Sequence, residues 1–252
     1  MKIMRRIGVI SDIHGNLEAL EAVLKSLGQD GVDHLVQLGD LVGYNANPRE
    51  CLELAREHGI TGVMGNHDLA ILDPRVAEDF NLLAHQALHY SAGQLTEEDR
   101  RYLEALPGSV TLLDQYLFCH GTPESIGSYI LHVFQAKRVF NLLQKRHAAV
   151  HACFFGHTHL QRVWIRDERG KVTSPDSTPG VLRLEEEKLY LVNPGSVGQP
   201  RQGSSRAHYL VFDVASGVVH FRSVAYDIRG AQKKILEAGL PQYLALRLQE
   251  GV

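Results

Sequence analysis

Five short segments of the sequence carry side chains that can bind metal ions, and each segment follows a run of apolar residues. Aspartate, histidine and asparagine dominate these segments, and glycine accompanies them throughout. The segments are Ser11-Asp12-Ile13-His14-Gly15-Asn16, Gly39-Asp40, Gly65-Asn66-His67-Asp68, His120-Gly121 and Gly156-His157-Thr158-His159. Because glycine lets the backbone turn sharply and come close to an ion or a phosphate, this composition predicts loops built around a ligand.

The spacing of these residues predicts a shared site. In Asp12-x-His14 and His157-x-His159 the two side chains are two positions apart, so they point to the same side of an extended segment. Carboxylate, imidazole and amide ligands without thiolates suit manganese, iron, zinc and, less well, magnesium. Two such ions about 3.5–4 Å apart are a known arrangement for phosphoryl chemistry. We therefore predict two divalent metal ions, with manganese the first candidate, bridged by one carboxylate.

Each residue also has an ordinary structural interpretation. An isolated Asp or His after a strand is more often a turn cap or a surface residue. Nine further histidines fit that interpretation, namely His34, His58, His85, His89, His132, His147, His151, His208 and His220. Five segments of one kind, all following strand-like runs, favour a common site instead.

Alternating strands and helices must position the first three segments. Apolar runs predict strands at residues 7–10, 34–38 and 60–64, and helices are predicted at 17–27 and 48–56. This β-α-β-α-β order favours a parallel or mixed sheet covered by helices. In such α/β sheets ligands gather at the ends of strands, which is where the polar segments fall.

The remainder of the chain is predicted to be helical at first and then rich in strands. Residues 69–106 are typical of a helical insertion, and residues 167–180 of a mobile loop. Further strands are expected at 110–113, 116–119, 152–155, 162–166, 188–192, 208–214 and 218–224, with helices at 135–146 and 228–237. At 252 residues the chain can form one domain, and we predict a single domain over 1–252.

Composition excludes several classes of protein. A net charge of -3 provides no broad basic field, which argues against nucleic acid or anionic lipid as a partner. The apolar run after the basic start is short, and no stretch reaches the ~18 apolar residues of a membrane helix. Three scattered cysteines, Cys51, Cys119 and Cys153, favour a reducing compartment over a disulfide framework. We expect a cytoplasmic protein.

Taken in order, the five segments resemble the motif set of the calcineurin-like metallophosphoesterases. The resemblance covers roughly residues 7–200 and extends to the small bacterial branch described as YfcE-like or diadenosine-tetraphosphatase-like. Residues 39–44 (Gly-Asp-Leu-Val-Gly-Tyr) and 193–201 (Asn-Pro-Gly-Ser-Val-Gly-Gln-Pro-Arg) support that branch. The family implies an α/β (α+β) fold, a four-layer αββα sandwich of two mixed β-sheets flanked by helices.

The same resemblance implies a role for each site residue. Asp12, His14 and His159 would hold one metal ion, Asn66, His120 and His157 would hold the second, and Asp40 would bridge the two. A hydroxide between the ions would attack phosphorus in line. His67, protonated and oriented by Asp68, would assist the leaving group.

Two further residues are candidates for binding substrate. Asn16 would either contact the site or cap the helix that starts at Leu17. Arg201 would either grip a phosphate with two hydrogen bonds or lie at the surface in water. We expect hydrolysis of a small-molecule phosphodiester or phosphomonoester, with a nucleotide as one candidate. The alternatives are a protein serine/threonine phosphatase and a metal-bound interaction scaffold without activity, and the absence of basic tracts disfavours a nuclease.

Overall fold

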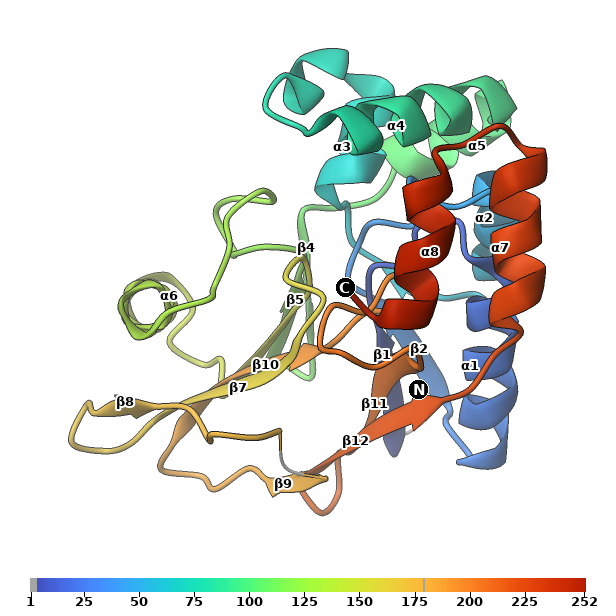
Figure 1. Ribbon diagram of the computed structural model, residues 1–252. Helices are drawn as coiled ribbons and strands as arrows, with labels where there is room; N and C mark the ends of the chain where they lie inside the picture. Colours follow the sequence, from blue (N-terminus) through green and yellow to red (C-terminus); the bar gives the residue numbers. More distant parts are fainter. Residues whose placement is uncertain (1–3, 179) are drawn as a thin grey trace.

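Two β-sheets that face each other form the centre of the protein in a computed structural model, which describes residues 4–178 and 180–252 (Figure 1). The first sheet has the strand order β3-β2-β1-β11-β12-β9. Its strands are β1 (Arg6–Ile10), β2 (His34–Gln37), β3 (Thr61–Gly62), β9 (Val181–Arg183), β11 (Ala207–Asp213) and β12 (Val218–Val224). β1, β2 and β3 are parallel, whereas β11, β12 and β9 join antiparallel, so the sheet is mixed.

The second sheet is also mixed and has the order β4-β5-β6-β10-β7-β8. Its strands are β4 (Ser109–Leu112), β5 (Tyr116–Cys119), β6 (Ala152–Phe155), β7 (Gln161–Arg166), β8 (Val172–Thr173) and β10 (Leu189–Pro194). The parallel strands β5, β6 and β10 form its middle. The parallel strands thus form one half of the first sheet and the middle of the second, and polar segments follow most of them.

Side-chain alternation along the strands divides the core into layers. In β1, Ile7 and Val9 pack between the two sheets, whereas Ile10 packs beneath the helices on the outer face. Phe118 and Phe154 of the second sheet meet Ile7 and Val9 in the inner layer, with their two rings stacked 4.9 Å apart. Both faces of each central strand are thus buried, which explains their nearly continuous apolar runs.

Helices cover the outer face of each sheet. Helices α1 (Leu17–Gln29) and α2 (Pro48–Glu57) pack on the first sheet, α7 (Ile228–Glu237) packs on α1, and α8 (Gln242–Glu250) packs on α7. Beyond the strand ends lie α3 (Asn66–Leu72), α4 (Leu82–Gln94) and α5 (Glu97–Glu104), with a short 3₁₀ turn at Pro74–Ala77 (Figure 1). On the second sheet lies α6 (Val133–Arg146), whose buried face packs on β5 and β6 (Figure 1). The predicted four-layer αββα arrangement is confirmed.

Several boundaries differ from those predicted. β3 covers only two residues of the predicted 60–64 strand, because the N–H of Met64 leaves the ladder and donates to the carbonyl of Pro107 at 2.9 Å. Helix α8 and strand β9 were not predicted. Within the predicted loop 167–180, β8 pairs with β7, and Pro179 lies outside the described residues. No helix in the described ranges has the length and apolar character needed to span a membrane.

Candidate metal centre

The side chains predicted to bind metal lie together and are buried. They come from loops after β1, β2, β3, β5 and β6, which meet at one edge of the paired sheets. Asp12, His14 and His120 have no exposed surface, and Asn66 is the most exposed ligand candidate, at 7%. The buried residues in this group are Asp12, His14, Asp40, Asn66, His67, His120, His157 and His159. The structure therefore brings the predicted site residues together in one buried cluster.

The backbone of this cluster adopts an unusual conformation. Eight residues other than glycine have a positive φ in the described chain, and six of them lie here: Asp12, His14, Asp40, Tyr44, His157 and His159. Such conformations cost about 1–3 kcal/mol each and persist only where surrounding contacts enforce them. Main-chain hydrogen bonds supply that enforcement, since the N–H of Asp12 donates to Gly39 and the N–H of His14 to Asp40, at 3.1 and 2.9 Å. Strain concentrated in this way is typical of a functional site.

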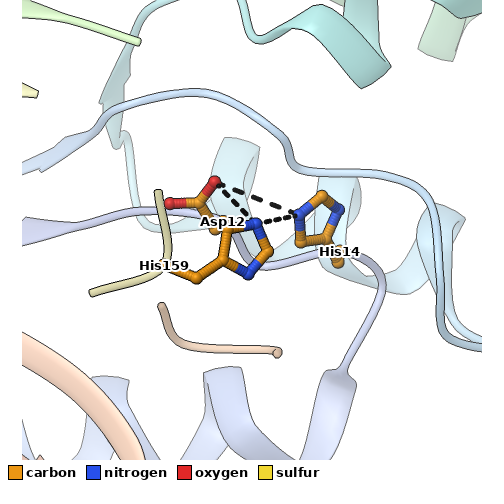
Figure 2. Close-up of side chains that lie close together, drawn as sticks. All are labelled: Asp12, His14 and His159. Atoms are coloured by element: carbon orange, nitrogen blue, oxygen red, sulfur yellow. Dashed lines mark hydrogen bonds and ion pairs between the residues drawn. The ribbon is translucent and has the colours of Figure 1, made fainter. Parts of the chain in front are cut away.

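Asp12, His14 and His159 form the first group of potential ligands (Figure 2). Nε2 of His159 lies 3.3 Å from Oδ1 of Asp12, and Nε2 of His14 lies 4.0 Å from the same oxygen. The two Nε2 atoms are 3.2 Å apart. The three side chains thus point into one space from the loops after β1 and β6.

Asp40, Asn66, His120 and His157 form the second group. Nε2 of His120 lies 2.9 Å from Oδ1 of Asn66 and 3.3 Å from Oδ2 of Asp40. That same oxygen of Asp40 is 3.6 Å from Nε2 of His14, which belongs to the first group. Asp40 therefore stands between the two groups, as a bridging carboxylate must.

The hydrogen bonds of the histidines show that the cluster suits cations. Nδ1 of His14, His120 and His159 lies 2.6–2.9 Å from the main-chain oxygens of Val42, Leu38 and Gln199, respectively. A neutral ring that donates from Nδ1 presents a bare lone pair at Nε2. The Nε2 atoms of His14 and His159 then face each other as two acceptors, which is unfavourable without a cation between them. Backbone partners of this kind fix metal-binding histidines in many proteins.

The titration of the cluster supports the same conclusion. Burial raises the pKa of Asp12 to about 7, with the charge of Asp40 adding to the effect and His120 opposing it. Burial lowers the pKa of His120, but the charge and hydrogen bond of Asp40 outweigh it and raise that pKa to about 10. Without metal, the cluster therefore retains protons near neutral pH. Divalent cations would take the place of these protons.

His67 and Asp68 do not form the predicted pair. Oδ2 of Asp68 accepts the N–H groups of Asp40 and Gly65, and Oδ1 accepts those of Leu41 and Val42, at 2.8–3.2 Å. Nδ1 of His67 is buried and has no hydrogen-bond partner among the described residues. Both residues lie in the first turn of α3, where consecutive side chains point in different directions. Asp68 therefore holds the loop that carries Asp40, and the prediction that it orients His67 is wrong.

The surroundings of His67 favour its neutral form. Burial lowers the pKa of His67 to about 4, and the positive charges of His120 and Arg201 act in the same direction, whereas Asp40 opposes them. The ring lies against Tyr44, Phe80 and His14, with centroids 4.8–4.9 Å away. His67 is thus a neutral imidazole beside the cluster.

Asn16 and Arg201 have different surroundings. Oδ1 of Asn16 accepts the N–H of Ala19 and caps α1, while its Nδ2 donates to the carbonyl of Gly198. These contacts favour the helix-cap alternative over a contact with substrate. Arg201 is partly buried, and its Nε and Nη2 donate to Oε1 of Gln199, whose main-chain oxygen holds His159. Arg201 therefore lies at the edge of the cluster.

Residues 193–196 hold two of the loops that carry the cluster. Oγ of Ser196 donates to the carbonyl of Asp12 at 2.9 Å, and Nδ2 of Asn193 donates to the carbonyl of Gly156 at 2.7 Å. Sequence reasoning missed Tyr129, whose ring stacks on His157 with centroids 3.9 Å apart. No motif marks Tyr129, because it lies in the irregular loop before α6.

Comparisons with known proteins agree with this geometry. Residues 4–217 match a family model described as a calcineurin-like phosphoesterase superfamily domain. An uncharacterized protein of Methanocaldococcus jannaschii is 36% identical over 250 residues, which is 96% of each chain. The crystal structure of a metallophosphoesterase from Sphaerobacter thermophilus is 39% identical, covers 98% of this chain and 99% of its own, and superposes with a TM-score of 0.83.

A more distant relative has an activity in its name. Phosphodiesterase YfcE of Escherichia coli is 27% identical over 210 residues, which is 81% of this chain and 86% of its own. The resemblance to YfcE predicted from residues 39–44 and 193–201 is thereby confirmed. With the family match spanning most of the chain and the His/Asp cluster in place, the protein belongs to the calcineurin-like phosphoesterase superfamily and is a metal-dependent phosphoesterase.

Proposed function

We propose that the protein hydrolyses a small-molecule phosphodiester or phosphomonoester at a centre of two divalent ions, and a nucleotide is the first substrate class to examine. The observation that carries this proposal is the position of Asp40 between two groups of buried ligands. Asp12, His14 and His159 would hold one ion, and Asn66, His120 and His157 the other. Manganese is our first candidate, because it accepts all of these ligand types.

The residues of the chain would prepare the site for an anionic substrate. When bound, two divalent cations lower the pKa of a water molecule and offset charge on the phosphoryl oxygens. The backbone carbonyls that hold Nδ1 of His14, His120 and His159 keep the Nε2 lone pairs directed into the centre. Asp68 keeps Asp40 in position through the N–H groups that it accepts.

His67 is the candidate for assisting the leaving group. Its ring is adjacent to the ring of His14. The main-chain N–H of His67 donates to Oδ1 of Asp40 at 2.8 Å, which fixes the start of α3 against the centre. An anionic phosphate beside the ring would raise its low pKa and favour the protonated form. His67 would then donate a proton to the departing oxygen, an effect worth roughly 10²–10⁴-fold in rate.

Hydrolysis of p-nitrophenyl phosphate and of its bis-ester, with manganese, magnesium, iron or zinc, tests this proposal. We expect turnover of at least one ester with manganese. The variant His67→Ala should lose about 10²-fold or more in kcat while keeping its metal content. His89→Ala, an exposed histidine on α4, is the matched control and should behave as the wild type. Loss of metal in His67→Ala would make His67 a ligand, and a metal-loaded wild type without turnover would favour a non-catalytic scaffold.

A phosphopeptide assay distinguishes a protein serine/threonine phosphatase from a small-molecule phosphoesterase. If the protein is a serine/threonine phosphatase, it should release phosphate from phosphoserine peptides faster than it cleaves nucleotides and other small esters. We expect the reverse. Beside the cluster, Phe80 is only partly buried and Tyr129 is exposed, and both offer aromatic surfaces for a small ring-containing ester.

A further inference from the structure

Two arginines each lie over the ring of one tyrosine at the edge of the metal centre. The guanidinium carbon of Arg201 lies 6.0 Å from the centre of the Tyr44 ring, and that of Arg247 lies 5.8 Å from it. The Tyr44 ring is itself 4.6 Å from the ring of His14 and 4.8 Å from that of His67. Both guanidinium groups are therefore close to the place where the ester would be cleaved.

Arg247 reaches this position because helix α8 returns to the site. Leu244 and Leu248 of α8 pack in one buried cluster with Tyr44. At the end of α8, the carbonyl of Gly251 accepts the N–H of Gly203, at 2.9 Å, in the loop that follows Arg201. Figure 1 shows α8 beside the centre of the fold, with the chain ending near the loop before β11. The family match ends at residue 217, so Arg247 belongs to a part of the chain outside it.

Neither arginine pairs with an acidic side chain in the described part of the chain. Arg201 donates to the side-chain oxygen of Gln199, and Nε of Arg247 donates to the main-chain oxygen of Val252. No Asp or Glu among the described residues forms an ion pair with either guanidinium group. Burial lowers the pKa of Arg247, and the like charge of Arg201 lowers it further. Two partly buried cations beside one ring are unfavourable alone and favour a bound anion.

We propose that Arg201 and Arg247 bind a second phosphate group of the substrate, beside the phosphate that is cleaved. The planar guanidinium group can donate two parallel hydrogen bonds to phosphate oxygens, and the Tyr44 ring holds both groups at the site by cation–π contact. The substrate would then be an ester with linked phosphates, such as a nucleotide with a polyphosphate chain. This inference rests on the proposed function and adds a substrate class to it.

Binding of inorganic phosphate and inorganic tripolyphosphate to the manganese-loaded protein tests this inference. Titration calorimetry gives the two dissociation constants without any turnover. We expect the wild type to bind tripolyphosphate more tightly than phosphate. Arg247→Gln should weaken tripolyphosphate binding about tenfold, the effect of losing a hydrogen bond to a charged group, and change phosphate binding less than about twofold. Chelation of manganese by tripolyphosphate is common to all variants, so it cancels in the ratio of a variant's dissociation constant to that of the wild type.

Arg229→Gln is the matched control, because it removes the same charge from an exposed position on α7. It should leave both dissociation constants unchanged. Arg247→Lys keeps the charge and the stem but loses the planar donor pair, so it should weaken tripolyphosphate several-fold. It also supplies the same comparison if Arg247→Gln does not fold.

Three results would overturn the inference. The first is that the wild type binds phosphate and tripolyphosphate equally tightly. The second is that Arg247→Gln weakens the binding of both ligands by the same factor. The third is that Arg229→Gln weakens tripolyphosphate binding as much as Arg247→Gln does. A different result would mean that the proposed function fails while this inference holds. No ester would then be hydrolysed, but the wild type would still bind tripolyphosphate more tightly than phosphate, and Arg247→Gln would still remove that preference.

Discussion

Replacing Asp68 with asparagine should loosen the loop that carries Asp40. The Asp68 carboxylate accepts N–H groups from Asp40, Leu41, Val42 and Gly65, so both of its oxygens are in use. An amide has the same shape but presents an NH₂ group in place of one oxygen. Two backbone N–H groups would then face a donor and lose their partner.

The size of the effect follows from the number of bonds lost. Leaving a buried donor unsatisfied costs about 1–3 kcal/mol. Two such donors predict that the free energy of unfolding of Asp68→Asn falls by roughly 2–5 kcal/mol, since the loop can relax in part. Burial, followed by the charge of Asp40, raises the pKa of Asp68 to about 7. The comparison is therefore made near pH ~8.5, where the native carboxylate is charged and accepts from all four N–H groups. Because the raised pKa means that ionisation of Asp68 opposes folding at this pH, the loss should lie toward the lower end of this range.

Urea unfolding and manganese titration together test this reasoning. Asp68→Asn should lose stability and also bind manganese at least about tenfold more weakly, because Asp40 is no longer held in place. The control is Asp99→Asn, which removes another buried carboxylate that binds Arg56 and caps α5. It should lose stability without losing manganese. If Asp68→Asn instead keeps full stability and metal affinity but loses kcat, Asp68 acts on His67 and the reasoning is refuted.

Two further predictions concern the ligand loops. Metal binding should release about two protons per chain near pH ~6, where Asp12 and His120 are both protonated without metal, and about one near pH ~8.5, where only His120 is. Calorimetry in buffers of different ionisation enthalpy measures this, and a release that does not change with pH would contradict it. Gly65→Ala should abolish metal binding, because its Cβ would lie within contact of the N and Oδ1 of Asp40. Gly93→Ala, a helical glycine with open space around its Cβ position, should keep metal and gain about 0.5–1 kcal/mol of stability in urea unfolding; equal behaviour of the two variants would refute the packing argument.

The ligand cluster could be predicted because local sequence determines it. Asp12 and His14 follow a buried strand directly, so both lie at its end; their positive φ values show that the segment is not extended, so the expected two-residue alternation does not place them. His157 and His159 likewise follow β6 with positive φ, and they belong to different groups of ligands. Parallel strands then bring these loops to one edge without any information about distant contacts. The pairing of β1 with β2 in register confirms this for the first sheet.

Other features depend on contacts that no local pattern contains. Asp68 follows His67 in the sequence, which suggested a pair, but in the first turn of a helix it acts as the N3 residue and accepts N–H groups from its own turn and from the Asp40 loop. Arg247 lies on a helix of ordinary amphipathic sequence. Its position over Tyr44 arises only when α8 packs beside α4 and α7. Long-range packing of this kind must be seen in three dimensions.

The number and position of the metal ions test the central claim most directly. We expect anomalous diffraction from crystals of the manganese-loaded protein to show two peaks on either side of Asp40. One peak should contact Asp12, His14 and His159, and the other Asn66, His120 and His157. A single peak, or two peaks that do not share the carboxylate of Asp40, would contradict the account.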